Sequence, residues 1–217
     1  MSVGQGLQTC AGEDLDMNIH HMIKKSVREI RSEGFWHTLR EIAYSNRVMV
    51  AVEKDIKMTA SLLPERMTAI VVDQTNYGTY RKAYDIGSVL SYCKRGAQAL
   101  MVFEGFRLMG YQLWTRNKDF VDLRKLDIAL EDNAAYLFDL FVLPEFRGTV
   151  VPKIVATETF NYLASRRIEK IYGFYYKDNI KALWWHRAYL RCREIREVPT
   201  RRYFILERTR GRWSLKI

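Results

Sequence analysis

Residues 135–143 limit the fold most strongly, because they form an almost unbroken apolar run that contains a single acid, Asp139. A continuous run of this length suits a central β-strand that is buried on both faces. Pro144 begins a break that extends to Gly148, and residues 151–167 then place apolar side chains on one helical stripe. The sequence therefore predicts a strand, a turn and a helix in succession, as in an α/β fold.

Apolar periodicity and turn residues predict the other elements as well. A short Gly105 turn between two strand-like runs is typical of a hairpin, and Gly96 is placed to end a helix. The predicted order is strand 47–52, strand 67–73, helix 80–94, hairpin 99–103 with 107–114, loop with a helical turn 117–133, strand 170–176, helix 179–196 and strand 202–207. This order indicates a mixed α/β fold around one sheet, without internal repeats.

The chain of 217 residues suits one main domain with an N-terminal addition. Residues 1–12 are small and polar, so we expect a disordered tail. Helical spacing between Ile19 and Ile30 predicts a helical extension over residues 13–46, and residues 47–217 form the main domain. The sequence leaves open whether this extension covers a cleft, forms a homodimer or packs on the sheet.

Several classes of protein are disfavoured by what the sequence does not contain. No apolar run approaches the roughly 20 residues of a membrane helix, and the first residues do not resemble a secretory leader. The three cysteines are far apart without a CxxC pair, which disfavours a disulfide framework or a metal site. Neither GxxxxGK[ST] nor GxGxxG is present, which disfavours nucleotide hydrolysis and dinucleotide binding. We expect a cytoplasmic protein.

Positive charge is concentrated at the C-terminal end of the sequence. Residues 185–217 hold ten basic and three acidic residues, and so contribute +7 of the net charge of +10. Such a segment attracts polyanions, namely nucleic acid, acidic lipid or a phosphorylated cofactor. A solvated basic face is the alternative.

The turn at residues 147–153 is a candidate phosphate site. It contains Arg147 and Gly148 and leads into a predicted helix, whose first N–H groups and positive dipole end attract anions.

Several motifs of this chain, taken together, resemble the GNAT superfamily of acyl-CoA-dependent N-acyltransferases. Val142, Pro144, Arg147 and Gly148 match the family's Val-x-Pro-x-x-Arg-Gly pattern at the end of its fourth strand. Asn179 with Ala182 matches the family's Asn-x-x-Ala, and the hairpin at 99–114 is similar to its second and third strands. The resemblance covers residues 99–207, and more loosely the chain from residue 47. It implies a single mixed, mostly antiparallel sheet flanked by helices.

The resemblance also implies acetyl-CoA or another acyl-CoA as co-substrate. Val150 departs from the family pattern because it replaces a glycine, and Pro152 removes one N–H donor. Charge from Arg147 and Lys153 is expected to compensate. The residues implied in coenzyme binding are Phe141, Val142, Leu143, Arg147, Gly148, Thr149, Val150, Val151, Lys153 and Asn179.

Acyl transfer to an amine needs a base, a polarised thioester carbonyl and a proton for the departing thiolate. By resemblance, main-chain N–H groups at residues 141–143 meet the carbonyl, Asp139 is the base, and His186 is the acid in place of the family's tyrosine. A structural ion pair for Asp139 and simple helix packing for His186 are the alternatives.

The sequence therefore predicts an N-acyltransferase that transfers an acyl group, expected to be acetyl, to an amine by direct attack. A catalytically degenerate GNAT-fold binding module and a basic nucleic-acid-associated protein are the alternatives. The amine acceptor and the acyl length cannot be derived from the sequence.

Overall fold

The computed structural model describes residues 44–81, 87–203, 206–209 and 212–215. The predicted tail at 1–12 and the predicted extension up to residue 43 lie outside the described residues. The chain divides into two compact units. One unit is Val48–Val198, and the other combines Met1–Arg47 with Pro199–Ile217.

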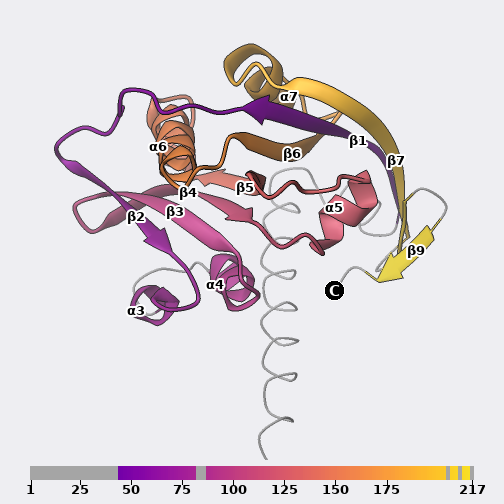
Figure 1. The fold of residues 1–217 in the computed structure, drawn as a ribbon, viewed down its shortest axis with the longest axis horizontal. Coiled ribbons are helices and arrows are strands. Elements are labelled where there is room, and N and C mark those ends of the chain that lie inside the picture. The colour runs from indigo at the N-terminus through magenta and orange to yellow at the C-terminus, as the bar shows by residue number, and fades with distance from the viewer. Residues whose placement is uncertain (1–43, 82–86, 204–205, 210–211, 216–217) are drawn as a thin grey trace, which may run out of the picture. The chain divides into compact units, whose positions relative to one another are not determined.

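The unit Val48–Val198 is built on one mixed sheet, as predicted (Figure 1). The strands follow the order β2-β3-β4-β5-β6-β1-β7, in which β5 and β6 are parallel, whereas β2 with β3, β3 with β4, β4 with β5, and β1 with β6 are antiparallel. Their bounds are β1 Tyr44–Asp55, β2 Met67–Val72, β3 Gln98–Glu104, β4 Arg107–Thr115, β5 Ala134–Val142, β6 Lys170–Tyr176 and β7 Arg193–Tyr203.

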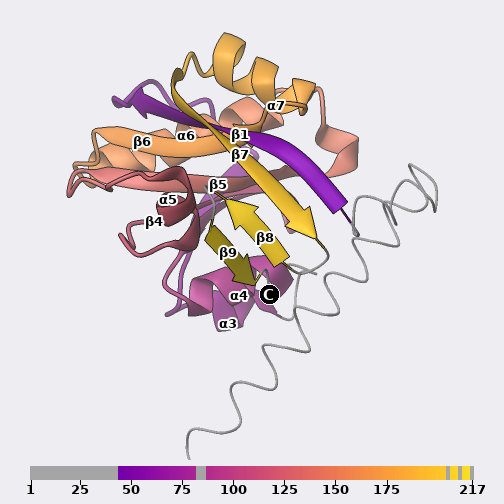
Figure 2. The ribbon, with the colours of Figure 1, turned by 90° about the vertical axis from the view of Figure 1, so that its right-hand side faces the viewer.

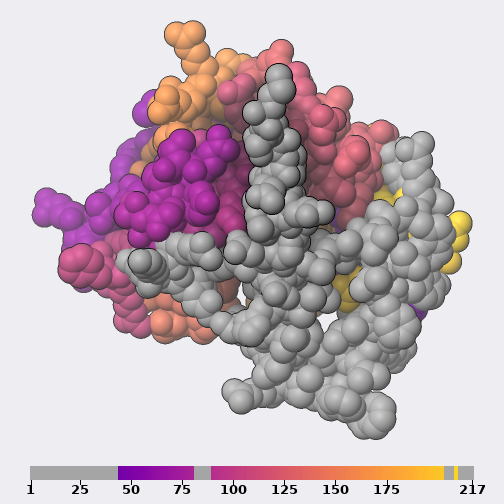
Figure 3. All heavy atoms as spheres, turned by 90° about the horizontal axis from the view of Figure 1, so that it is seen from below, coloured from indigo at the N-terminus to yellow at the C-terminus, as the bar shows by residue number. Residues whose placement is uncertain are grey.

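Helices cover both faces of this sheet (Figure 1). One face carries α6 (Val151–Ser165), α7 (Ile180–Trp184) and the π-helical turn η2 (Trp185–Tyr189). The opposite face carries α3 (Tyr77–Arg81), α4 (Gly87–Lys94) and α5 (Val121–Leu126), and Figure 3 views the molecule from the side of α3 and α4. A short 3-10 helix, η1 (Pro144–Phe146), connects β5 to the loop before α6.

The apolar run predicted as a central strand is β5. Ala135 and Leu137 pack in the cluster formed with α6, whereas Tyr136 and Phe138 pack on the other face against α5. Alternation along a strand sends successive side chains to opposite faces. Both faces of the first half of β5 are therefore buried, as the sequence predicts.

The predicted hairpin is confirmed as β3 and β4, with Gly105 at φ 58° in its turn. The predicted helix 80–94 is confirmed where the chain is described, because α3 covers Tyr77–Arg81 and α4 covers Gly87–Lys94, and residues 82–86 lie outside the described chain. Gly96, at φ 83°, follows α4 as expected. Strand β1 begins at Tyr44, so residues 44–46 of the predicted extension are in a strand.

The predicted helix 179–196 also ends early. Arg191 adopts φ 54°, in the left-handed region that a continuing α-helix does not use, and β7 begins at Arg193. The predicted strand 202–207 is shifted, because β7 extends to Tyr203 and a further strand, β8, covers Leu206–Thr209.

The second unit contains the end of β7 with β8 and β9 (Arg212–Leu215), drawn in yellow in Figure 2. These strands pair antiparallel, with Thr200 opposite Thr209 and Leu206 opposite Leu215. The helices in the described part of the chain are too short or too polar to cross a bilayer.

Candidate active site

The candidate site lies where β5 and β6 separate. Their parallel pairing extends over three residues of each strand and ends at the pair Tyr136 and Tyr172. Gly173 follows at the fork, where an added Cβ would lie 3.3 Å from the carbonyl oxygen of Leu137. A glycine at this point therefore lets the two strands stay close before they part.

A β-bulge shapes β5 just past the fork. Leu113 of β4 lies opposite Phe138 and Gln112 opposite Leu140, so Asp139 is the extra residue. Asp139 has φ 53° and is exposed, and its Oδ2 accepts a hydrogen bond of 3.2 Å from the Tyr111 hydroxyl. Asp139 lies within the strand that the sequence predicts to be buried on both faces, but the bulge turns this residue out of the pleat.

The second half of β5 directs main-chain groups toward the gap between the strands. Leu143 donates its N–H to the Met109 carbonyl of β4 at 3.0 Å. Because hydrogen-bonded and non-hydrogen-bonded pairs alternate in an antiparallel ladder, the N–H groups of Val142 and Leu140 point to the opposite edge. Of the three predicted carbonyl-binding positions, Leu143 is used within the sheet, Phe141 faces Tyr111 of β4, and Val142 is turned toward the gap.

His186 approaches the same gap from η2. Its Nδ1 lies 2.7 Å from the Ala182 carbonyl oxygen, and its ring stacks on Tyr175 with centroids 5.1 Å apart. A carbonyl only accepts hydrogen bonds, so Nδ1 carries the proton and Nε2 keeps its lone pair. Burial lowers the pKa of His186, and the backbone hydrogen bond opposes this only in part. The imidazole is therefore neutral at pH 7.

The ring under His186 is itself held in place. The Tyr175 hydroxyl donates to Glu194, and Arg187 pairs with the same carboxylate through two nitrogens. Burial and the Glu194 hydrogen bond raise the pKa of Tyr175 to about 12. Tyr175 is thus a protonated stacking partner for His186, and a sequence pattern does not show this arrangement because Glu194 comes from β7.

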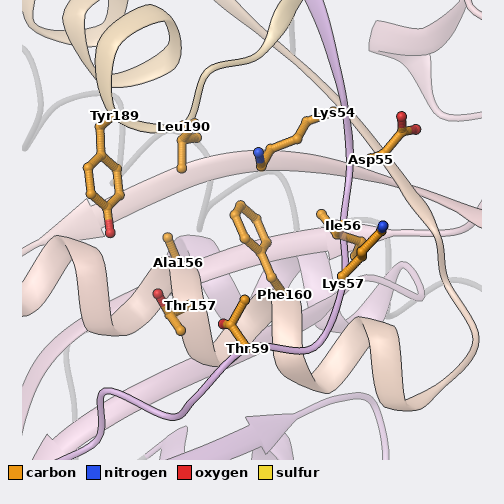
Figure 4. A pocket seen from close by; sticks show the side chains of 10 residues that line it. All are labelled: Lys54, Asp55, Ile56, Lys57, Thr59, Ala156, Thr157, Phe160, Tyr189 and Leu190. Carbon is orange, nitrogen blue, oxygen red and sulfur yellow. The ribbon is translucent and has the colours of Figure 1, made fainter.

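The structure brings the two predicted catalytic residues to one cavity. A cavity of about 100 Å³ at the fork is lined by both Asp139 and His186. Beside it lies a larger groove of about 410 Å³ between α6, η2 and the end of β1 (Figure 4). Ala156, Phe160 and Leu190 line both. Sequence reasoning missed this groove, since its residues come from segments about 100 positions apart.

In the predicted phosphate turn, some main-chain N–H groups are used in local hydrogen bonds and others are not. Gly148 has φ 79°, whereas Val150 has φ −73°, so the β-branched side chain at 150 needs no left-handed backbone. Thr149 donates its N–H to the Phe146 carbonyl at 3.3 Å, and Val151 donates to the Thr149 Oγ1 at 3.2 Å. Within the described chain, the N–H groups of Gly148 and Val150 meet no acceptor.

The other predicted coenzyme residues line neither cavity. Arg147 turns back, so that its Nε donates to the Val142 carbonyl at 3.1 Å. Lys153 is exposed, with its ammonium 5.1 Å from the centroid of Tyr189 in η2. Asn179 caps α7, because its Oδ1 accepts the Ala182 N–H at 3.1 Å. The structure therefore gives these three residues local contacts around the turn and α7.

No protein-family model matches the sequence, and no curated protein matches it. Among solved structures, a GCN5-related N-acetyltransferase-like protein from Streptococcus suis is similar, with a TM-score of 0.50 and 11% identity over 79% of this chain and 68% of that one.

Two further solved structures have the same family description. A GNAT-family protein from Novosphingobium aromaticivorans has a TM-score of 0.49 and 17% identity over 73% of this chain, and a GCN5-related N-acetyltransferase from Sphaerobacter thermophilus has a TM-score of 0.46 and 10% identity over 78%. The matches span 66% and 56% of those two chains, which is less than two thirds of their length. The chain has a divergent GNAT fold.

Proposed function

We propose that the protein is an acyl-CoA-dependent N-acyltransferase, with its active site in the cavity between β5 and β6. The observation that carries the proposal is the fork itself. It combines parted parallel strands, main-chain N–H groups facing the gap, and a neutral histidine on the other wall. A catalytically degenerate binding module would not need this combination.

The residues present fit an acyl-CoA. A thioester lying in the gap would place its carbonyl oxygen against the Val142 or Leu140 N–H, and the pyrophosphate would meet the Gly148 and Val150 N–H groups and the Lys153 ammonium. Acyl-CoA supplies an activated acyl group whose carbon–sulfur bond breaks as the carbon–nitrogen bond to the amine forms. The carbonyl contact and the anion contacts thus come from opposite ends of residues 139–153.

His186 is the proposed base. Its Nε2 lone pair accepts the proton that the attacking amine loses, and the imidazolium then returns that proton to the departing sulfur. Both the base and the acid role of the reaction fall on this one ring, and Asp139 shapes the bulge. This assignment differs from the expectation of an Asp139 base with a His186 acid, because Asp139 is exposed and His186 is neutral.

Calorimetry with acetyl-CoA and longer acyl-CoAs tests the proposal. We expect binding, and no binding of any acyl-CoA at near-millimolar concentration would refute it. With a panel of amines and thiol release as the readout, His186→Gln is expected to lower kcat about 100- to 10,000-fold. The same substitution should change the dissociation constant by less than about threefold. Ser165→Ala, at the end of α6, is the control that keeps both values. Equal losses in turnover and affinity would exclude the base role.

Nucleic-acid binding through the basic C-terminal segment is less well supported. Arg187 pairs with Glu194, Arg193 with Glu53 and Arg196 with Asp127. These carboxylates offset the arginines of η2 and β7 in the described chain. A filter-binding assay with tRNA and duplex DNA at rising salt concentration measures the affinity that the basic segment provides, because binding through phosphate contacts weakens as salt rises.

A further inference from the structure

The groove beside the fork is larger than an acetyl group requires. The fork cavity occupies about 100 Å³, whereas the groove adds about 410 Å³. A methylene has roughly the volume of a water molecule, about 30 Å³. The groove therefore has room for several carbon atoms beyond those of an acetyl group.

The groove continues from the fork cavity and does not form a separate site. Ala156 and Phe160 of α6 and Leu190 after η2 line both spaces. Figure 4 shows the Phe160 ring standing up from α6 in the middle of the groove. A chain that starts at the fork, between Asp139 and His186, can extend past these apolar side chains without leaving contact with the protein.

The far part of the groove changes from apolar to cationic. Lys54 and Lys57 line it, and neither forms an ion pair with a carboxylate of the described residues. Figure 4 shows the Lys54 nitrogen above the Phe160 ring, while the carboxylate of Asp55 points away from the groove. Lys54 is half-buried as a residue, so part of its side chain packs against the protein. A half-buried cation over an apolar floor suits an anion at the end of an apolar chain.

We infer that the acyl donor carries an acyl chain longer than acetyl with a carboxylate at its far end, and that Lys54 binds this carboxylate. The inference rests on the proposed function, because it assumes a thioester at the fork. Ala156, Phe160 and Leu190 contact the methylene groups of the chain. Lys57 and Thr59, from the same segment as Lys54, also line the groove.

Calorimetry with two donors of equal length tests the inference. Glutaryl-CoA and valeryl-CoA both carry five-carbon acyl chains, and only glutaryl-CoA ends in a carboxylate. Glutaryl-CoA should bind about tenfold or more tightly, since a hydrogen-bonded ion pair of this kind corresponds to at least one factor of ten. Equal affinities, or tighter binding of valeryl-CoA, would overturn the inference.

Two variants test whether Lys54 causes the expected preference for glutaryl-CoA. Lys54→Met keeps the length of the side chain and removes its charge, so it should abolish the preference for glutaryl-CoA while acetyl-CoA binding changes by less than about twofold. Lys118→Met is the matched control, because Lys118 pairs with Asp132 and lines neither cavity. A preference that persists in Lys54→Met would contradict the assignment of Lys54.

Filling the groove provides a second test. Thr157→Trp should weaken glutaryl-CoA and valeryl-CoA binding alike and spare acetyl-CoA, and uniform loss of all three would count against a separate chain site. A different result would refute the proposed function itself. If wild-type protein binds neither acetyl-CoA nor either longer donor, both the proposed function and this inference are refuted.

Discussion

Residues 134–136 and residues 137–142 belong to one strand, β5, but their surroundings differ. The first three pair with β6, Tyr136 also pairs with Thr115 of β4, and all three are buried. The rest pair only with β4, include the bulge at Asp139, and are mostly half-buried. One half of the strand therefore supplies stability, and the other half supplies the free main-chain edge that the proposed chemistry uses.

The largest expected effect is on the free energy of unfolding, which should fall more when a side chain is removed from the first half of β5 than from the second half. Tyr136→Ala removes a fully buried ring and should lower the free energy of unfolding by roughly 3–5 kcal/mol. Leu140→Ala, in the parted half, should lower it by at most about 2 kcal/mol because Leu140 is only half-buried. Urea denaturation measures both. Similar losses would mean that the two halves contribute alike to the core.

Two glycines in the neighbouring strands, Gly110 of β4 and Gly173 of β6, lie close to carbonyl oxygens of β5, and substituting each with alanine tests how closely the strands pack there. Gly110→Ala would place a methyl carbon 2.7 Å from the Phe141 carbonyl oxygen, and should destabilise by about 1–3 kcal/mol. Gly173→Ala at the fork meets the Leu137 carbonyl oxygen at 3.3 Å, and should change stability by less than about 1 kcal/mol. Thermal denaturation compares them. The reverse order would show that the fork is the more rigid of the two places.

The bulge offers a smaller and more selective test. Asp139→Val must hold a β-branched residue at φ 53°, which should lower stability by about 1–2 kcal/mol. Asp139→Asn tolerates that backbone and should change stability by less than about 0.5 kcal/mol. If His186 is the base, Asp139→Asn should also keep turnover within about threefold. A hundredfold loss in Asp139→Asn would return the base role to the carboxylate.

The smallest expected effect is a displaced titration. Because burial lowers the pKa of His186, its ring should titrate below 6.5 in an NMR pH series, with His186→Gln used to assign the signal. The folded protein disfavours the charged ring, so the stability tied to it is complete above pH 6.5 and is lost as the pH falls through the folded pKa. A midpoint above 6.5 would show that the folded protein favours the charged ring, which suits an acid better than a base.

Sequence patterns predicted the strands around the site better than the site itself. The apolar run of β5, the turn at Gly148 and the order of strand, helix and strand follow from local periodicity and turn residues. The bulge at Asp139 does not, because it arises from the register with β4. A single acid in an apolar run is compatible with either a buried charge or an outward turn.

The electrostatics of His186 depend on contacts that are distant in sequence. Tyr175 supports the ring, Glu194 holds Tyr175, and burial sets the ring's protonation. The early end of the helix at Arg191 had no sequence signal either, because a non-glycine residue takes the left-handed conformation there. Neither arrangement follows from the spacing of residues along the chain.

The position of β1 has a consequence for how the protein forms. This strand precedes the other strands of the described chain, yet it lies between β6 and β7, which come late in the sequence. During synthesis, β1 must wait for more than 100 further residues before its partners emerge, exposing an unpaired edge meanwhile. Such distant pairing makes folding slow. A fragment beginning after Asp55 would leave β6 without its neighbour, so truncation from the N-terminus should trap the nascent sheet in an aggregation-prone state.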